Sequence, residues 1–125
     1  MNERGRFKAK ARARGFVFAF RGLTHVVKTQ HNMWIHLAIT LAVIVAAVLL
    51  RVNKVDWLWL IISVTLVFFA EVINSAFEFL CDVVRPEHHD AVAKAKDIAA
   101  GAVLLVALGA AIIGAIVFWP YIFQH

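Results

Sequence analysis

Residues 98–123, IAAGAVLLVALGAAIIGAIVFWPYIF, decide the fold of this 125-residue chain, because these 26 residues include no Asp, Glu, Lys or Arg. A helix rises about 1.5 Å per residue, so the run is long enough to cross a hydrocarbon core of about 30 Å. Ala107, Ala111 and Ala115 recur at every fourth position, and small residues at that spacing let helix backbones approach closely. The stretch therefore predicts a transmembrane helix.

Two more runs of the same kind precede it. Residues 33–50 carry no formal charge, and neither do residues 57–70, whose apolar continuation to Cys81 contains Glu71 and Glu78. The whole chain is 62% hydrophobic and 17% charged, against about 25% charged in soluble domains. A soluble bundle would need polar helix faces that these segments lack. We therefore expect an all-α integral membrane fold with transmembrane helices over residues 33–51, 56–84 and 92–122.

The basic residues gather at the N-terminus. Residues 1–31 hold 8 of the 13 Lys and Arg residues but only one of the 8 acidic residues. Because basic segments beside transmembrane helices stay in the cytoplasm, we expect a cytoplasmic N-terminus and, after three spans, an outside C-terminus. The chain thus divides into a basic cytoplasmic segment, residues 1–31, and a three-span membrane domain, residues 32–125.

Within the basic segment, residues 16–29 have the pattern of an amphipathic surface helix. Phe16, Phe20, Leu23 and Val27 fall on one face, whereas basic residues occupy another. Such a helix lies in the headgroup plane of a membrane and is attracted to anionic lipids. A second interpretation is that Arg21 also binds a phosphate-bearing ligand. Nucleic acid is a poor partner, because the segment is attached to a membrane domain.

Polar side chains inside the second predicted span are the most informative residues. Glu71, Ser75, Glu78 and Asp82 stand at i, i+4, i+7 and i+11 on one helix face, with Asn74 beside them. Ionisable groups at membrane depth are costly and usually functional. Asn74 or Ser75 alone would suit hydrogen bonding between helices. Two glutamates about 10 Å apart can have separate roles, in which one carboxylate holds a divalent metal and the other acts as a base.

The segment after this span adds acidic, basic and imidazole groups. Residues 85–97 read RPEHHDAVAKAKD, and carboxylates with lysines are the groups that Mg²⁺ and phosphates need, which points to phosphoryl transfer. A zinc site at the two histidines would lack further ligands at a suitable spacing. The chain has neither G-x-x-x-x-G-K-[ST] nor G-x-G-x-x-G. A nucleotide site would therefore have to be built from membrane helices and short loops. Because one three-span protomer has too few helices to enclose such a site, we expect an oligomer.

The run Glu71-Val-Ile-Asn-Ser-Ala-Phe-Glu78, followed by Asp82, by Glu87-His-His89 and by Ala95-Lys-Asp97, resembles the signature of the bacterial integral-membrane diacylglycerol kinase and undecaprenol kinase family. The resemblance implies a homotrimer in the bacterial inner membrane. It also implies transfer of the γ-phosphoryl group of MgATP to a membrane lipid alcohol, at a site between protomers on the cytoplasmic side.

The same resemblance implies roles for single residues. Glu71 matches the catalytic base and Glu78 a metal ligand, while Gln30 stands where the family usually has a second metal-binding glutamate. The supporting positions in the active site are Asn74, Ser75 and Asp82, and those of the nucleotide site are Arg21, Glu87, His89, Lys96 and Asp97.

Two questions of function stay open at this point. His88-His89 and the run AKDIAAGA, residues 95–102, look more like the undecaprenol kinase branch, with diacylglycerol as the alternative substrate. A small transporter or a non-catalytic membrane scaffold could also carry carboxylates in a span. A transporter would not need Glu87, His89, Lys96 and Asp97 together on one side.

Overall fold

The computed structural model describes residues 3–124 and consists of four helices. They are α1 (Glu3–Thr29), α2 (His31–Leu49), α3 (Lys54–Val84) and α4 (Asp90–Phe123). Within the described range no strand is present, so the all-α prediction is confirmed. Helices α2, α3 and α4 correspond to the three expected spans, and each is long and apolar enough to cross a membrane.

Each of these three helices begins two residues before the expected start. The residues before the apolar runs supply the helix starts. Asn53 precedes α3, and its Oδ1 accepts a 2.8 Å hydrogen bond from the Asp56 amide. His89 precedes α4, and its Nδ1 accepts a 3.2 Å hydrogen bond from the Ala91 amide. Such caps satisfy amides that have no partner within the helix.

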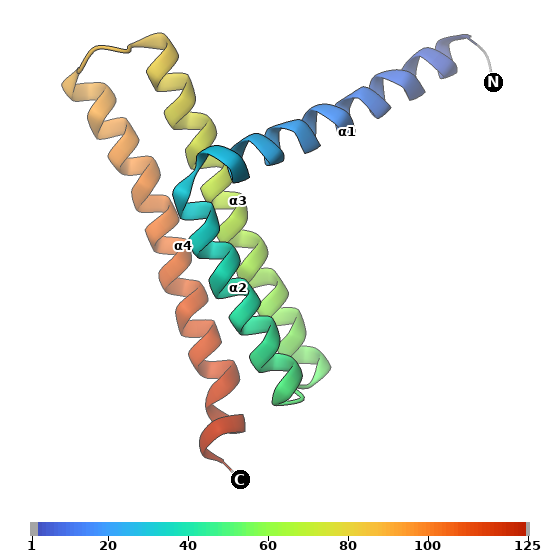
Figure 1. Ribbon diagram of the computed structural model, residues 1–125, viewed down its shortest axis with the longest axis vertical. Coiled ribbons are helices and arrows are strands. Elements are labelled where there is room, and N and C mark those ends of the chain that lie inside the picture. Colours follow the sequence, from blue (N-terminus) through green and yellow to red (C-terminus); the bar gives the residue numbers. More distant parts are fainter. Residues whose placement is uncertain (1–2, 125) are drawn as a thin grey trace.

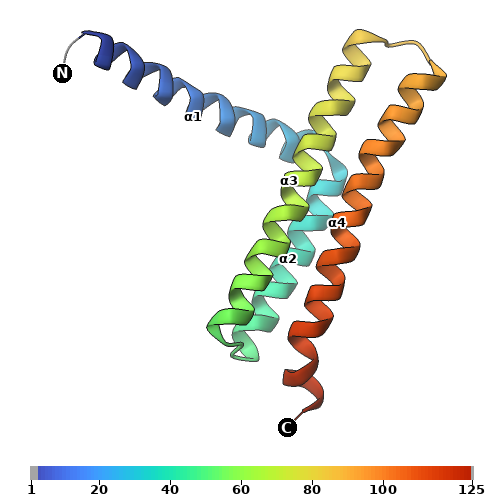
Figure 2. The ribbon, with the colours of Figure 1, turned by 180° about the vertical axis from the view of Figure 1, so that it is seen from behind.

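Helices α2, α3 and α4 run side by side, whereas α1 leaves the bundle to one side (Figures 1 and 2). Helix α3 packs chiefly against α4 and also against α2. The loop between α3 and α4 lies at one end of the molecule, and the turn between α2 and α3 lies at the other end with the C-terminus (Figure 1). Helix α2 begins part-way along the bundle, so α3 and α4 extend beyond it toward the loop.

Helix lengths explain this extension. At about 1.5 Å per residue, α2 with 19 residues is about 28 Å long, close to the thickness of a bilayer core. Helices α3 and α4 have 31 and 34 residues, or about 46 and 51 Å. A core of about 30 Å therefore takes in α2 but cannot take in all of α3 or α4.

Most of the large apolar side chains point outward. Leu49 and Leu105 are 76% and 73% exposed, and the buried apolar cluster is the small group Ala47, Val52, Leu60 and Val117 near the α2–α3 turn. In water such a surface would be unstable, whereas hydrocarbon requires only that backbone polar groups be satisfied within each helix. The fold is that of a membrane protein.

The turn between α2 and α3 is built around Arg51, the one described non-glycine residue with a positive φ, 53°. The Arg51 amide donates to the Val48 carbonyl and the Val52 amide to the Ala47 carbonyl, both at 3.2 Å. This pair of bonds is a Schellman motif, in which the left-handed residue is usually glycine. Val52 and Ala47 also belong to the same buried core.

A polar clamp joins the start of α3 to the end of α4. The Tyr121 hydroxyl donates to Asp56 Oδ2 at 2.7 Å and accepts from the Asn53 amide at 3.0 Å. These contacts connect residues more than 60 positions apart, so the clamp links the ends of the two longest helices.

The N-terminal helix is longer than the sequence pattern indicated. It begins at Glu3, thirteen residues before the expected position 16, because residues 3–15 are mostly Ala, Lys and Arg, which favour helix. Only Val26 is buried among its residues. The last turns of α1 pack against α2 and α3.

Candidate active site

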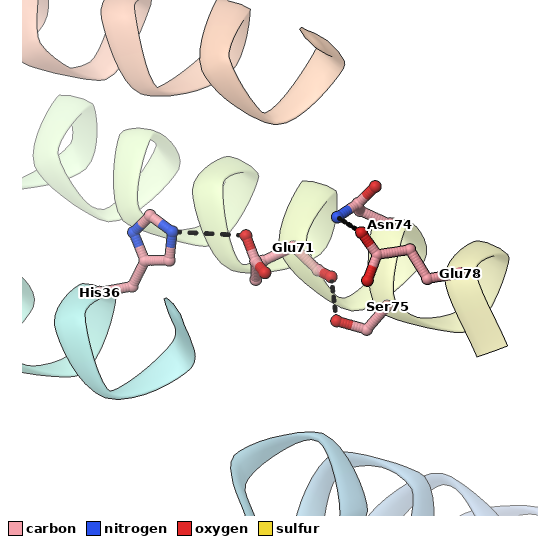
Figure 3. Close-up of polar contacts among 5 residues, drawn as sticks. All are labelled: His36, Glu71, Asn74, Ser75 and Glu78. Atoms are coloured by element: carbon pink, nitrogen blue, oxygen red, sulfur yellow. Dashed lines mark hydrogen bonds and ion pairs between the residues drawn. The ribbon is translucent and has the colours of Figure 1, made fainter. Parts of the chain in front are cut away.

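The most deeply buried large side chain of the described residues is that of Glu71, which is 2% exposed. One of its carboxylate oxygens, Oε2, lies 3.5 Å from Nε2 of His36 on α2 (Figure 3). A carboxylate removed from water keeps its charge only with a partner. The pair therefore places a polar, ionisable centre between two helices whose other surfaces are apolar.

The next turn of α3 continues this polar row. The Asn74 side chain, through Nδ2, donates to Glu78 Oε1 at 3.4 Å, and the Ser75 hydroxyl donates to the Glu71 main-chain carbonyl at 2.8 Å (Figure 3). Asn74 Oδ1 is buried without a hydrogen-bond partner among the described residues. The Ser75 hydroxyl therefore donates within its own helix, whereas the Asn74 Oδ1 atom can still accept a hydrogen bond from another group.

Exposure rises along this face of α3 toward the loop. Glu71, Asn74 and Ser75 are buried, Glu78 is half-buried, and the Asp82 side chain is 65% exposed. The gradient follows from the geometry of the bundle, because α3 leaves the cover of α2 over these turns (Figure 1). The face predicted from spacing thus leads from a protected carboxylate to an accessible one.

Helix α4 meets this face through Lys96. The Lys96 Nζ donates a 2.6 Å hydrogen bond to Asp82 Oδ1 and forms an ion pair with it. Two residues of the expected site are therefore brought together across the α3–α4 interface. Asp97, the next residue, is exposed and is not part of this pair.

The residues of the loop between α3 and α4 lie on the surface. Glu87 lies 3.8 Å from Arg85, and His88 lies 3.2 Å from Asp90. Such exposed pairs contribute little stability. His89 serves as the cap of α4. The structure thus places Glu87 and His89 at the end of the molecule that carries the α3–α4 loop, beyond the Asp82–Lys96 pair.

The two remaining candidate residues belong to α1 and to its junction with α2. Gln30 has extended backbone between α1 and α2 and makes no side-chain cap. It lines a groove of about 290 Å³ between α1 and α3, together with Ser75. Arg21 is exposed on α1, with its guanidinium 5.6 Å from the centre of the Phe18 ring.

The donor set bears on whether Mg²⁺ fits. No cluster of three or more His, Cys, Asp or Glu side chains is found within residues 3–124. Mg²⁺ is seldom held by an all-protein cage, because one or two carboxylates plus substrate phosphates usually bind it. The half-buried Glu78 carboxylate meets that minimal requirement, while Gln30 lines the groove that Ser75 also lines.

The sequence reasoning missed His36. The signal was present, because His36 is the one titratable side chain in the charge-free run of residues 33–50. Its position on α2 gave no indication of a partner 35 residues away on α3.

Comparison with known proteins identifies the family. The family model for prokaryotic diacylglycerol kinase matches residues 17–118. The undecaprenol kinase of Bacillus subtilis (strain 168) is 33% identical over 107 residues, which cover 86% of this chain and 87% of that protein. The diacylglycerol kinase of Synechocystis sp. (strain ATCC 27184 / PCC 6803 / Kazusa) is 38% identical over 106 residues, 84% of this chain and 61% of the relative. That of Escherichia coli (strain K12) is 37% identical over 84 residues, 67% of this chain and 68% of the relative. The chain belongs to the prokaryotic diacylglycerol kinase family and is a lipid kinase of that type.

Proposed function

We propose that this protein transfers the γ-phosphoryl group of MgATP to the hydroxyl of a membrane lipid alcohol, with undecaprenol as the favoured substrate. The observation that carries the proposal is the buried Glu71 carboxylate beside His36, in a helix face that leads to the Asp82–Lys96 pair. A lipid hydroxyl approaches from within the membrane, whereas ATP approaches from water. The face of α3 connects the two environments.

In the proposed reaction Glu71 accepts the proton of the lipid hydroxyl. The lipid oxygen forms a bond to the γ-phosphorus while the bond from that phosphorus to the bridging oxygen of ADP breaks. General-base help of this kind contributes about 10²- to 10⁴-fold. The burial of Glu71 supports the assignment, because the base is kept from bulk water that would compete as the phosphoryl acceptor.

Glu78 would hold Mg²⁺, and Gln30 is the candidate for a second oxygen ligand. The metal, when bound, neutralises charge on the phosphates. Lys96 is assigned the same role from the α4 side, and Asp82 keeps its ammonium at the α3–α4 interface. Asn74 and Ser75 support Glu71 and Glu78 on α3. The assigned nucleotide contacts are Glu87, His89 and Asp97 near the α3–α4 loop, together with Arg21 on α1.

We further propose a homotrimer in the bacterial inner membrane, with the site shared between protomers. Support comes from the small buried core and the largely outward apolar surface of a single chain. In this assembly the N-terminus and the α3–α4 loop are cytoplasmic and the C-terminus is outside. Helix α1 rests on anionic headgroups through its basic residues.

The choice of substrate is supported by one relative. The Bacillus subtilis undecaprenol kinase matches this chain over nearly the full length of both proteins. Diacylglycerol is the second candidate, because the Synechocystis and Escherichia coli relatives are named diacylglycerol kinases.

The experiment uses purified protein in detergent micelles with γ-labelled ATP and one lipid alcohol at a time. We expect label in undecaprenyl phosphate, with little or none in phosphatidic acid. Label in phosphatidic acid alone would reverse the substrate assignment. Label in neither lipid, from a protein whose oligomer is intact, would contradict the proposal as a whole.

A further inference from the structure

We propose that His36 is a positioning residue for Glu71, holding one carboxylate oxygen so that the other faces the lipid hydroxyl. The inference rests on the proposed function, because it gives a role to a contact of the assigned base. His36 lies on α2, whereas the base was identified from the acidic face of α3.

Two residues of α3 locate the imidazole ring. Its Nε2 lies 3.5 Å from Glu71 Oε2, and its ring meets the Phe68 ring edge-on, with 6.3 Å between centroids and 71° between planes. Phe68 and Glu71 are three positions apart on α3, so they present neighbouring surfaces to the ring. The histidine is therefore held by an apolar contact and a polar contact at the same time.

The carboxylate needs such a partner. The Glu71 side chain is 2% exposed and that of His36 is 18% exposed, so water does not supply the hydrogen bonds that an ionised carboxylate requires. Within residues 3–124, His36 is the polar side chain that pairs with the Glu71 carboxylate, and its Nε2 faces Oε2 (Figure 3). Oε1 is left to accept a proton.

His36 also borders empty space, which constrains the choice of variants. It lines an apolar groove of about 360 Å³ between α2, α3 and α4. A substitution to Ala would enlarge this groove and add a packing defect to the loss of the polar contact. We therefore use Leu, which fills space without a polar group, and Gln, which keeps a donor at the end of a flexible side chain.

The test compares steady-state kinetics of His36→Leu and His36→Gln. We expect His36→Leu to lower kcat by about 10- to 100-fold with little change in KM for ATP, because a misplaced reacting group affects the chemical step. His36→Gln should recover a large part of kcat. The matched control is His31→Leu, the same substitution at an exposed site on the same helix, which should keep the parental kcat.

A double-mutant cycle connects the effect to Glu71. In a Glu71→Asp background the carboxylate is withdrawn by about one carbon–carbon bond, roughly 1.5 Å, so His36→Leu should cost far less than in the parent. Equal costs in both backgrounds would show that His36 acts independently of Glu71 and would overturn the inference. Equal losses in the Leu and Gln variants, or a loss confined to KM, would overturn it as well.

The failure of the proposed base is distinguishable from the failure of this inference. If Glu71→Gln keeps full activity, the assigned base is wrong and the role of His36 falls with it. If Glu71→Gln is inactive while His36→Leu keeps the parental kcat, only the positioning role is refuted.

Discussion

The Lys96 ammonium on α4 lies 2.6 Å from Oδ1 of Asp82 on α3, on the part of the bundle that extends beyond α2. This contact ties the basic residue assigned to the phosphates to the helix that carries the assigned base. Asp82 follows Glu71 by eleven positions on one face of α3. The active site proposed here thus depends on how α3 and α4 pack.

The first prediction concerns that contact. Asp82→Asn removes the charge that holds Lys96, while the shape of the side chain is kept. Because the pair is partly exposed, the effect should be modest, a rise in KM for ATP of about two- to fivefold. Steady-state kinetics at varied ATP measures it. Asp90→Asn, a change at another exposed acidic residue near the loop, is the matched control and should leave KM unchanged.

The second prediction concerns the buried carboxylate. Glu71→Gln keeps the size of the side chain but cannot accept the proton of a lipid hydroxyl. Turnover should fall by about 10²-fold or more, with the oligomer intact by size-exclusion chromatography in detergent. Glu3→Gln, at the exposed start of α1, should keep parental turnover. Appreciable phosphorylation by the Glu71 variant would refute its role as the base.

The third prediction concerns Gln30. A glutamate at this position would add a charged oxygen ligand near the groove between α1 and α3. Gln30→Glu should therefore lower the Mg²⁺ concentration that gives half-maximal activity. The measurement is a Mg²⁺ titration at fixed ATP. An unchanged midpoint would show that residue 30 does not contact the metal.

The fourth prediction concerns the turn at Arg51. Its φ of 53° is left-handed, a conformation that costs a side-chain-bearing residue about 1–2 kcal/mol and glycine little. Part of that gain is offset by the greater freedom of glycine in the unfolded chain. Arg51→Gly should therefore stabilise the fold by about 0.5–1 kcal/mol. Thermal unfolding in detergent checks this, and a lower midpoint would contradict the strain at this turn.

The fifth prediction concerns the clamp between the ends of α3 and α4. Tyr121→Phe removes the hydroxyl that joins Asp56 to the Asn53 amide and leaves the ring in place. The midpoint of thermal unfolding should fall by roughly 3–5 °C. The kcat should stay at the parental value, because the clamp lies at the end of the bundle opposite the loop (Figure 1). A large loss of kcat with unchanged stability would contradict this purely structural role.

Much of the fold followed from local pattern. The charge-free runs predicted α2, α3 and α4 to within two residues at their starts, because a helix in hydrocarbon satisfies its backbone within itself. The start of α1 was misplaced, since the amphipathic pattern begins later than the helix-favouring composition. Spacing on α3 brought Glu71 and Glu78 to one face, but it contained no information on their exposure.

The sequence by itself determined the class of fold, the number of helices, the starts of α2, α3 and α4 to within two residues, and the family signature on α3. These are properties of neighbouring residues, because helix hydrogen bonds and face periodicity extend only three or four positions. Only the tertiary structure decided that His36 meets Glu71, that Lys96 meets Asp82 and that Tyr121 closes the far end. Those contacts join residues 14 to 65 positions apart, and they arise from how the helices pack, which no local pattern specifies.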